Sequence, residues 1–220
     1  MSAPTENKHA NRSAQTRERF IEAAQRLYAE RSIDSVSLNE ITVAAGQKNR
    51  NALQYHFGNR DGLLQSIIDQ HAGRVAELRR GYLARETDSG QQPASIAARA
   101  LVLPVVDYLE ENPGAIHYVK ILSQLAALNN DILNPSTSSG LTFQNDEAFD
   151  ATIRKAVAHL KAAEAQRRIF LAVSITFHCI ADTCRASQST TTGSNLHNSA
   201  ALFQQIVLTI EGLLGASAED

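Results

Sequence analysis

The 220-residue chain is 43% hydrophobic with a net charge of -2, so it can bury a core, and we do not expect it to be disordered. No segment has the roughly 20 consecutive apolar residues of a membrane span, and the N-terminus lacks the apolar centre of a signal peptide. We therefore expect a soluble cytoplasmic protein without a membrane partner. Cys179 and Cys184 are predicted to be reduced, because their spacing turns them to different faces of one helix.

The charges are distributed unevenly along the chain. Residues 1–60 hold nine of the 21 Lys and Arg and six of the 23 Asp and Glu, a surplus of three bases. The other twelve bases and seventeen acids give residues 61–220 a surplus of five acids. A basic head on an acidic body is typical of a protein that binds nucleic acid through one small domain.

Apolar residues recur at helical spacing along almost the whole chain, which predicts an all-α fold. Residues 1–12 are predicted to form a flexible arm, and the first helix is expected over about residues 13–30. Its apolar stripe contains Phe20, Ala24, Leu27 and Tyr28. Its other face is expected to carry Arg17, Arg19 and Arg26.

A second, short helix is predicted to begin at Ser37 and to end at Gly46. The sequence SLNE is typical of a capping box, in which the side chains of Ser37 and Glu40 each bond the other residue's backbone N–H. Gly46 is expected to be a left-handed C-cap that permits a sharp turn. Asn49 is then the expected N-cap of a third helix over residues 50–56.

The third helix is expected to have an apolar inner side and a polar outer side. Leu53 and Phe57 can pack inward on Ile41 and Phe20, and Tyr55 lies between the two sides, where packing is the favoured role. The outer residues are Arg50, Asn51 and Gln54, whose side chains match guanine and adenine edges in the major groove. Two short helices joined by a Gly turn predict a helix-turn-helix that binds double-stranded DNA.

Over about residues 13–66 the sequence resembles the tetracycline-repressor (TetR) family of bacterial transcription regulators. The resemblance rests on an ordered set of segments: RERFIEAAQRLYAERSIDSVSLNEITVAAG, then LQYHF, then GNRDGLL. The aromatic-His-Phe signature that closes the recognition helix of this family is Tyr55-His56-Phe57. The segment from Gly46 to His56 is one residue longer than is usual in this family. The extra residue falls in the turn before the recognition helix, and Lys48 lies in this turn.

The resemblance implies roles for individual residues. Arg50, Asn51 and Gln54 take base-facing positions, with Gln54 where an aromatic residue is commoner. Ser37 and Arg60 take phosphate-contacting positions, and Asn39 and His56 take positions that contact bases or backbone. The predicted DNA-binding set is Ser37, Asn39, Lys48, Asn49, Arg50, Asn51, Gln54, Tyr55, His56 and Arg60. An alternative role for His56 is to cap its helix as an imidazolium, which the helix dipole favours.

A fourth helix is predicted over about residues 59–85, interrupted by Gly73, which can localise bending or allow close packing. Further helices are expected over residues 93–112, with a kink at Pro104, and over residues 113–128. After a turn-rich connector at residues 129–141, two long helical patterns follow. The first covers about residues 144–159 and runs on to the region of Arg185. The second covers about residues 196–214.

We therefore divide the chain into an arm (1–12), a helix-turn-helix domain (13–58) and a helical effector-binding and dimerisation domain (59–215). Apolar groups surround most of the last two helices, and the resemblance implies that these helices pair with a second copy in a homodimer. The alternative is a buried monomer core. The interface candidates are Ile169, Phe170, Val173, Phe177, Ile180, Leu202, Phe203, Ile206 and Ile210.

The middle helices are expected to bind a small-molecule effector, apolar or aromatic, because they offer many apolar groups and few bases. The candidate pocket residues, whose alternative role is to complete the core, are Leu101, Val105, Tyr108, His117, Tyr118, Ile121, Leu125 and His178. His178 and Asp182 have the spacing of two metal ligands, but no third ligand follows, so a hydrogen-bonded pair is favoured. We predict no metal, no cofactor and no enzymatic activity, because no catalytic motif occurs.

The predicted function is a dimeric transcription regulator, a repressor in most members of the resembled family, that binds a palindromic operator and is released by a small molecule. The alternative is a helical protein-interaction module whose basic head binds anionic partners without sequence preference. Protection of a palindromic DNA site distinguishes the two.

Overall fold

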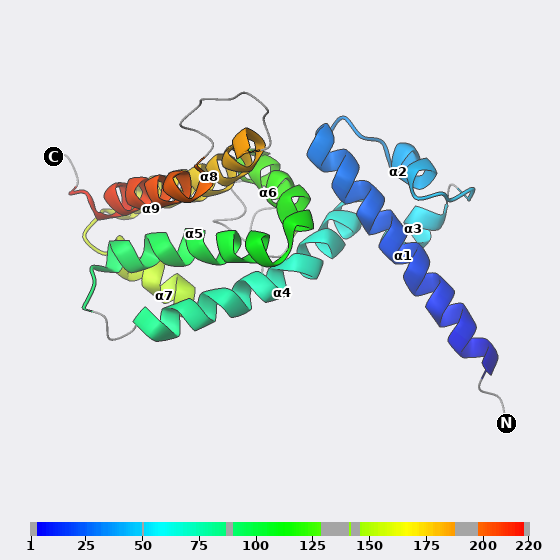
Figure 1. The fold of residues 1–220 in the computed structure, drawn as a ribbon, viewed down its shortest axis with the longest axis horizontal. Coiled ribbons are helices and arrows are strands. Elements are labelled where there is room, and N and C mark those ends of the chain that lie inside the picture. Colours follow the sequence, from blue (N-terminus) through cyan, green and yellow to red (C-terminus); the bar gives the residue numbers. More distant parts are fainter. Residues whose placement is uncertain are drawn as a thin grey trace. The chain divides into compact units, whose positions relative to one another are not determined.

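The computed structural model describes residues 4–49, 51–86, 90–128, 141, 146–187 and 198–217. All regular structure in these residues is helical, which confirms the predicted all-α fold (Figure 1). The helices are α1 (Pro4–Glu30), α2 (Leu38–Ala44), α3 (Ala52–Phe57), α4 (Arg60–Glu86), α5 (Pro93–Glu111), the short 3-10 helix η1 (Pro113–Ala115), α6 (Ile116–Leu128), α7 (Glu147–Ala156), α8 (Ala162–Ser187) and α9 (Ser199–Gly215).

The chain divides into two compact units, the first reaching Gln70 and also including Leu141, the second beginning at His71. The division lies later than the predicted boundary after residue 58. The reason is that the first turns of α4 pack on α1, where Gln25 donates a hydrogen bond to Gln70 (3.0 Å) and Arg17 to Ser66 (2.7 Å). Four apolar residues of α4 are buried beside these contacts: Leu63, Leu64, Ile67 and Ile68.

In the second unit, α5 packs on α7 and α9, and α8 packs on α6 and α9. The side chain of Arg168, only 9% exposed, joins the start of α8 to the end of α9. It donates hydrogen bonds to the carbonyl oxygens of Leu213, Ala216 and Ser217, and an ion pair with Glu164 orients it. These bonds satisfy carbonyl groups that a helix end leaves without partners.

Three of the longer helical segments differ from the sequence-based expectation. Helix α1 begins at Pro4, so residues 4–12 of the predicted flexible arm are helical. Proline is tolerated in the first turn of a helix, and a helix nucleated by its packed part extends at little further cost. Helix α4 runs through Gly73 without interruption, and the pattern from residue 144 to Arg185 is divided into α7 and α8 by residues 157–161.

Other predicted features agree with the structure. Helix α5 begins at Pro93, and the next helical segment begins at Pro113. Pro104 lies inside α5, and the kink expected there stays a prediction. Both cysteines are free thiols on α8. The connector at residues 129–140 lies outside the described residues.

Candidate nucleic-acid interface and core of the second unit

The predicted capping box at the start of α2 is present. The Ser37 hydroxyl accepts a hydrogen bond from the Glu40 N–H (3.2 Å), and the Glu40 carboxylate accepts one from the Ser37 N–H (2.9 Å). Arg31 adds an ion pair with Glu40, and its hydrogen bond, followed by those from Ser37, lowers the pKa of Glu40 to about 2. The start of α2 is therefore fixed by its own side chains, and Ser37 stays exposed.

The turn between α2 and α3 partly follows the sequence prediction. Gly46 has a positive φ of 69°, as expected for a glycine C-cap. Helix α3, however, begins at Ala52 with Asn51 as its N-cap, later than the predicted start at residue 50. Asn49 closes the turn before the helix instead, because its side-chain oxygen accepts from the Asn51 N–H (3.0 Å). Arg50 lies outside the described residues.

The outer side of α3 is polar and aromatic, whereas its inner side is apolar. Asn51 and Gln54 are exposed, while Leu53 and Phe57 are buried, as predicted. Tyr55 is 84% exposed, so the prediction that it packs inward is wrong. On such a short helix the two inward positions are filled by Leu53 and Phe57, and the Tyr55 ring meets the His56 ring edge to face (centroids 5.2 Å apart).

The exposed side of α2 continues this surface. Asn39 is exposed, and Val43, one turn later, is 68% exposed. Sequence reasoning missed Val43, although its exposure follows from the neighbouring Ile41 and Thr42, which face the core. An exposed aliphatic group beside polar ones can contact a thymine methyl group. Lys48 and Asn49 are exposed in the following turn.

Two arginines of the first unit are engaged in internal contacts. Arg17 donates to Ser66 and to the carbonyl oxygen of His56 (3.4 Å), with its guanidinium 4.6 Å from the centre of the Phe57 ring. The prediction that Arg17 lies on the outer face of α1 is therefore wrong. Arg17 is one turn before the buried Phe20, so the two side chains lie on the same, inner side of the helix. Arg60, a predicted phosphate contact, donates to the carbonyl oxygens of Ile33 (3.0 Å) and Val36 (2.9 Å).

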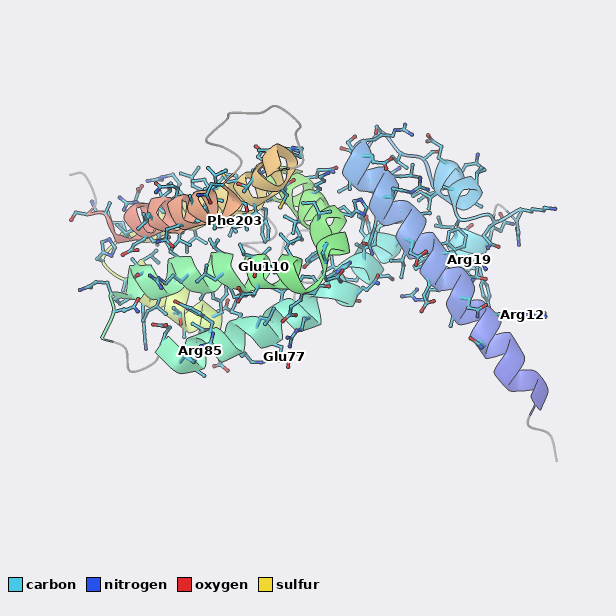
Figure 2. The ribbon with its side chains drawn as sticks, in the orientation of Figure 1. Arg12, Arg19, Glu77, Arg85, Glu110 and Phe203 are labelled. Atoms are coloured by element: carbon cyan, nitrogen blue, oxygen red, sulfur yellow. The ribbon has the colours of Figure 1, made fainter. Side chains whose placement is uncertain are left out.

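Among the α1 side chains that the structure describes, the exposed bases are Arg12, Arg19 and Arg26, and Figure 2 labels the first two. His56 is half-buried, and burial followed by the nearby charge of Arg17 lowers its pKa. This lowering disfavours the charged form of the ring, which the predicted alternative of an imidazolium helix cap requires.

In the second unit, six of the eight predicted pocket residues are buried, namely Leu101, Val105, Tyr108, Tyr118, Ile121 and Leu125, and His117 is half-buried. His178 is exposed, so its prediction as a pocket residue is wrong. Its ring nitrogen Nδ1 lies 3.0 Å from the carbonyl oxygen of Ser174. Asp182 pairs with Arg185 rather than with His178, because Arg185 follows one turn later on the same side of α8.

A buried histidine that sequence reasoning missed lies among these residues. His71 is 5% exposed, and its Nδ1 lies 2.7 Å from the hydroxyl of Tyr108. Its ring stacks on that of Tyr118, with centroids 4.6 Å apart, and burial lowers its pKa to about 4. The signal was present in the sequence, since His71 is four residues from Ile67 and from Val75 on the apolar stripe of α4.

The predicted interface residues on α8 and α9 separate into two groups. Ile180, Ile206 and Ile210 are at most 6% exposed within the single chain, so their assignment to a dimer interface is wrong. They face the α5–α8–α9 core. The half-buried group retains apolar surface and consists of Ile169, Phe170, Val173, Phe177, Leu202 and Phe203, the last labelled in Figure 2.

Two further apolar side chains on these helices are exposed, Leu171 (45%) and Leu208 (48%). Helix α8 is long and apolar enough to cross a membrane by length and composition alone, and 33% of its most apolar stretch is buried. The two helices thus expose more apolar surface than scattered single residues would give.

The first unit is similar in sequence to bacterial regulatory proteins. The family model described as bacterial regulatory proteins of the tetR family matches residues 20–67. The HTH-type transcriptional regulator AcrR of Shigella flexneri is 32% identical over 71 residues, which are 32% of this chain and 33% of that protein. The chain therefore matches about a third of the length of this curated relative.

Solved structures align over most of the chain at low identity. A TetR-family regulator from Streptomyces coelicolor is 14% identical with a TM-score of 0.44, over 92% of this chain and 96% of that one. A putative TetR-family regulator from Mesorhizobium loti is 15% identical with a TM-score of 0.40, over the same shares. RolR, solved with its ligand resorcinol, is 19% identical with a TM-score of 0.39, over 96% of this chain and 98% of that one.

Proposed function

We propose, from the match of residues 20–67 to the tetR family of bacterial regulatory proteins, that the first unit binds a DNA operator in the major groove. The observation that carries the proposal is the outer side of α3, where Asn51, Gln54 and Tyr55 are exposed on a helix whose inner side is buried. Amide side chains can bond an adenine edge bidentately. The exposed Asn39 and Val43 of α2 extend the same surface.

We further propose that the protein acts as a cytoplasmic homodimer that binds a palindromic operator. The half-buried apolar residues of α8 and α9, together with the exposed Leu171 and Leu208, support pairing with a second copy. Two-fold pairing gives two recognition helices, which bind half-sites about 34–36 Å apart on one face of DNA.

A small molecule bound in the second unit is proposed to release the operator, which makes the protein a repressor. Support comes from polar groups within an apolar core, where His71, Tyr108 and Tyr118 contact one another. A ligand with different affinities for the DNA-bound and free forms is sufficient to shift operator affinity.

Substitution of Gln54 tests the DNA-reading proposal. Gln54→Ala, or Asn51→Ala, is expected to weaken operator binding by about 1–3 kcal/mol and to relax the preference at one base pair. The measurement is selection from a randomised DNA pool followed by titration of the selected sites. Gln166→Ala, an exposed amide on α8, is the control and should change neither quantity. Unchanged base preference in both α3 variants would exclude direct readout by this helix.

A further inference from the structure

Two charged side chains, Arg79 and Asp146, lie beside one aromatic ring of the second unit. Phe149, in the first turn of α7, packs on a cluster formed by Tyr82 and Leu83 of α4 and Ala100 of α5. The guanidinium of Arg79 lies over the Phe149 ring, 4.4 Å from its centre. Asp146, the N-cap of α7, completes the group, because its Oδ1 accepts from the Phe149 N–H (3.3 Å).

The side chain of Arg79 is half-buried but has few partners. Its Nε donates to the carbonyl oxygen of Ala100 (3.0 Å), and within the described part of the chain no other hydrogen bond of this group is present. Burial lowers the pKa of Arg79 more than the nearby Asp146, Tyr118 and Asp150 raise it. A guanidinium has five donors, and Arg79 uses one of them here, so donors remain for another molecule.

A buried acceptor lies beside these donors. Oδ2 of Asp146 is inaccessible to solvent and has no hydrogen-bond partner within the described part of the chain. Leaving such a group without a partner costs about 1–3 kcal/mol, so native proteins pair it with a protein group, a water or a ligand.

The charges restrict what can satisfy both side chains together. Arg79 is already accompanied by two carboxylates, Asp146 and Asp150, so a ligand carboxylate would add a third negative charge, and a ligand cation would meet Arg79. A hydrocarbon would leave both groups without partners. A hydroxyl group, by contrast, donates one hydrogen bond and accepts others.

We propose that the effector is an uncharged molecule with a hydroxyl group on an apolar body, whose hydroxyl donates to Oδ2 of Asp146 and accepts from Arg79. The apolar body contacts Phe149 and the neighbouring Tyr82 cluster. The inference rests on the proposed effector-responsive function and adds to it the chemical class of the ligand and its two anchoring residues.

Calorimetric titration of the full-length protein with three probes of similar size tests the inference. Phenol is expected to bind about tenfold or more tightly than toluene, which lacks the hydroxyl, and than benzoate, which carries a charge. Asp146→Asn should weaken phenol binding by about tenfold. Asparagine retains the N-cap of α7, so this variant should fold. Asp107→Asn, an exposed residue of α5, is the matched control and should bind phenol like the wild type.

Equal binding of phenol and toluene, or unchanged phenol binding in Asp146→Asn, would overturn the inference. Absence of any phenol binding would also overturn it, because water alone then satisfies the two side chains. Arg79→Gln provides a second variant, and circular dichroism checks its folding. Operator binding without probe is measured in the same preparations, so loss of DNA binding with intact phenol binding would reject the proposed function and not the ligand class.

Discussion

The side chain of Arg60 joins the start of α4 to the loop before α2 through the carbonyl oxygens of Ile33 and Val36. Arg60→Ala should therefore lower the free energy of unfolding by about 1.5–3 kcal/mol, the usual contribution of hydrogen bonds to a charged group. Urea unfolding measures the change. Arg19→Ala, an exposed residue of α1, should change it by less than about 0.5 kcal/mol.

The same variant decides whether Arg60 also contacts phosphate. Under conditions where Arg60→Ala is fully folded, a phosphate contact would reduce the salt dependence of DNA binding by about one phosphate unit. An unchanged salt slope would leave Arg60 with its internal role alone.

His71 makes stability depend on pH. Its folded pKa of about 4 lies below the ordinary value near 6.5, so the unfolded chain binds the proton more readily and stability is lost as pH falls from about 6.5 to 4. The loss should approach about 3 kcal/mol and should be absent from His71→Gln. The surrounding Tyr108, Tyr118 and Asn112 carry no compensating negative charge at these pH values.

Urea titrations at pH 7, 5.5 and 4 measure this effect. Other carboxylates and histidines contribute alike to the wild type and the variant, so the difference between the two curves isolates His71. A difference that does not change with pH would contradict the burial of a neutral imidazole.

At the scale of single helices, two glycines of α4 differ in whether a larger side chain would fit. A Cβ at Gly73 would meet nothing within 4 Å, which excludes the predicted close-packing role, whereas a Cβ at Gly62 would collide with the carbonyl oxygen of Phe57. Gly73→Ala should raise stability by about 0.5–1 kcal/mol, because alanine restricts the unfolded chain. Gly62→Ala should lower it by about 1–3 kcal/mol.

Chemical unfolding of the two single variants checks both signs in one experiment. If Gly73→Ala weakens operator binding while it stabilises the protein, bending at this position is needed for function. Destabilisation by Gly73→Ala would contradict the open surroundings of this glycine.

At the scale of the whole molecule, substitutions on the apolar sides of α8 and α9 distinguish residues that support the proposed dimer from residues that support the fold of one chain. Phe177→Glu places a charge on a half-buried position and should convert the proposed dimer into folded monomers. Ile206→Glu buries a charge in the core and should cost at least about 3 kcal/mol of stability. Sedimentation and circular dichroism distinguish the outcomes, and Phe177→Leu should remain dimeric. A dimeric Phe177→Glu would place that side chain outside the interface.

The sequence by itself determined the features that depend on neighbours along the chain. The capping box of Ser37 and Glu40, the positive φ of Gly46, the buried Leu53 and Phe57 and the all-helical class follow from local hydrogen bonds and helical periodicity. The family motif also lies in one continuous stretch, residues 20–67, so it could be recognised from the sequence alone.

Only the tertiary structure decided what each residue contacts across the fold. Arg17 and Arg60 appear as surface bases in the sequence, yet they bond groups 24 or more positions away. Ile206 and Phe177 have the same apolar character, but packing against α5 buries one and leaves the other half-exposed. Arg79 and Asp146 come together around Phe149 only when α4 and α7 share the core of the second unit, because periodicity records which side of a helix is apolar and not which helix covers it.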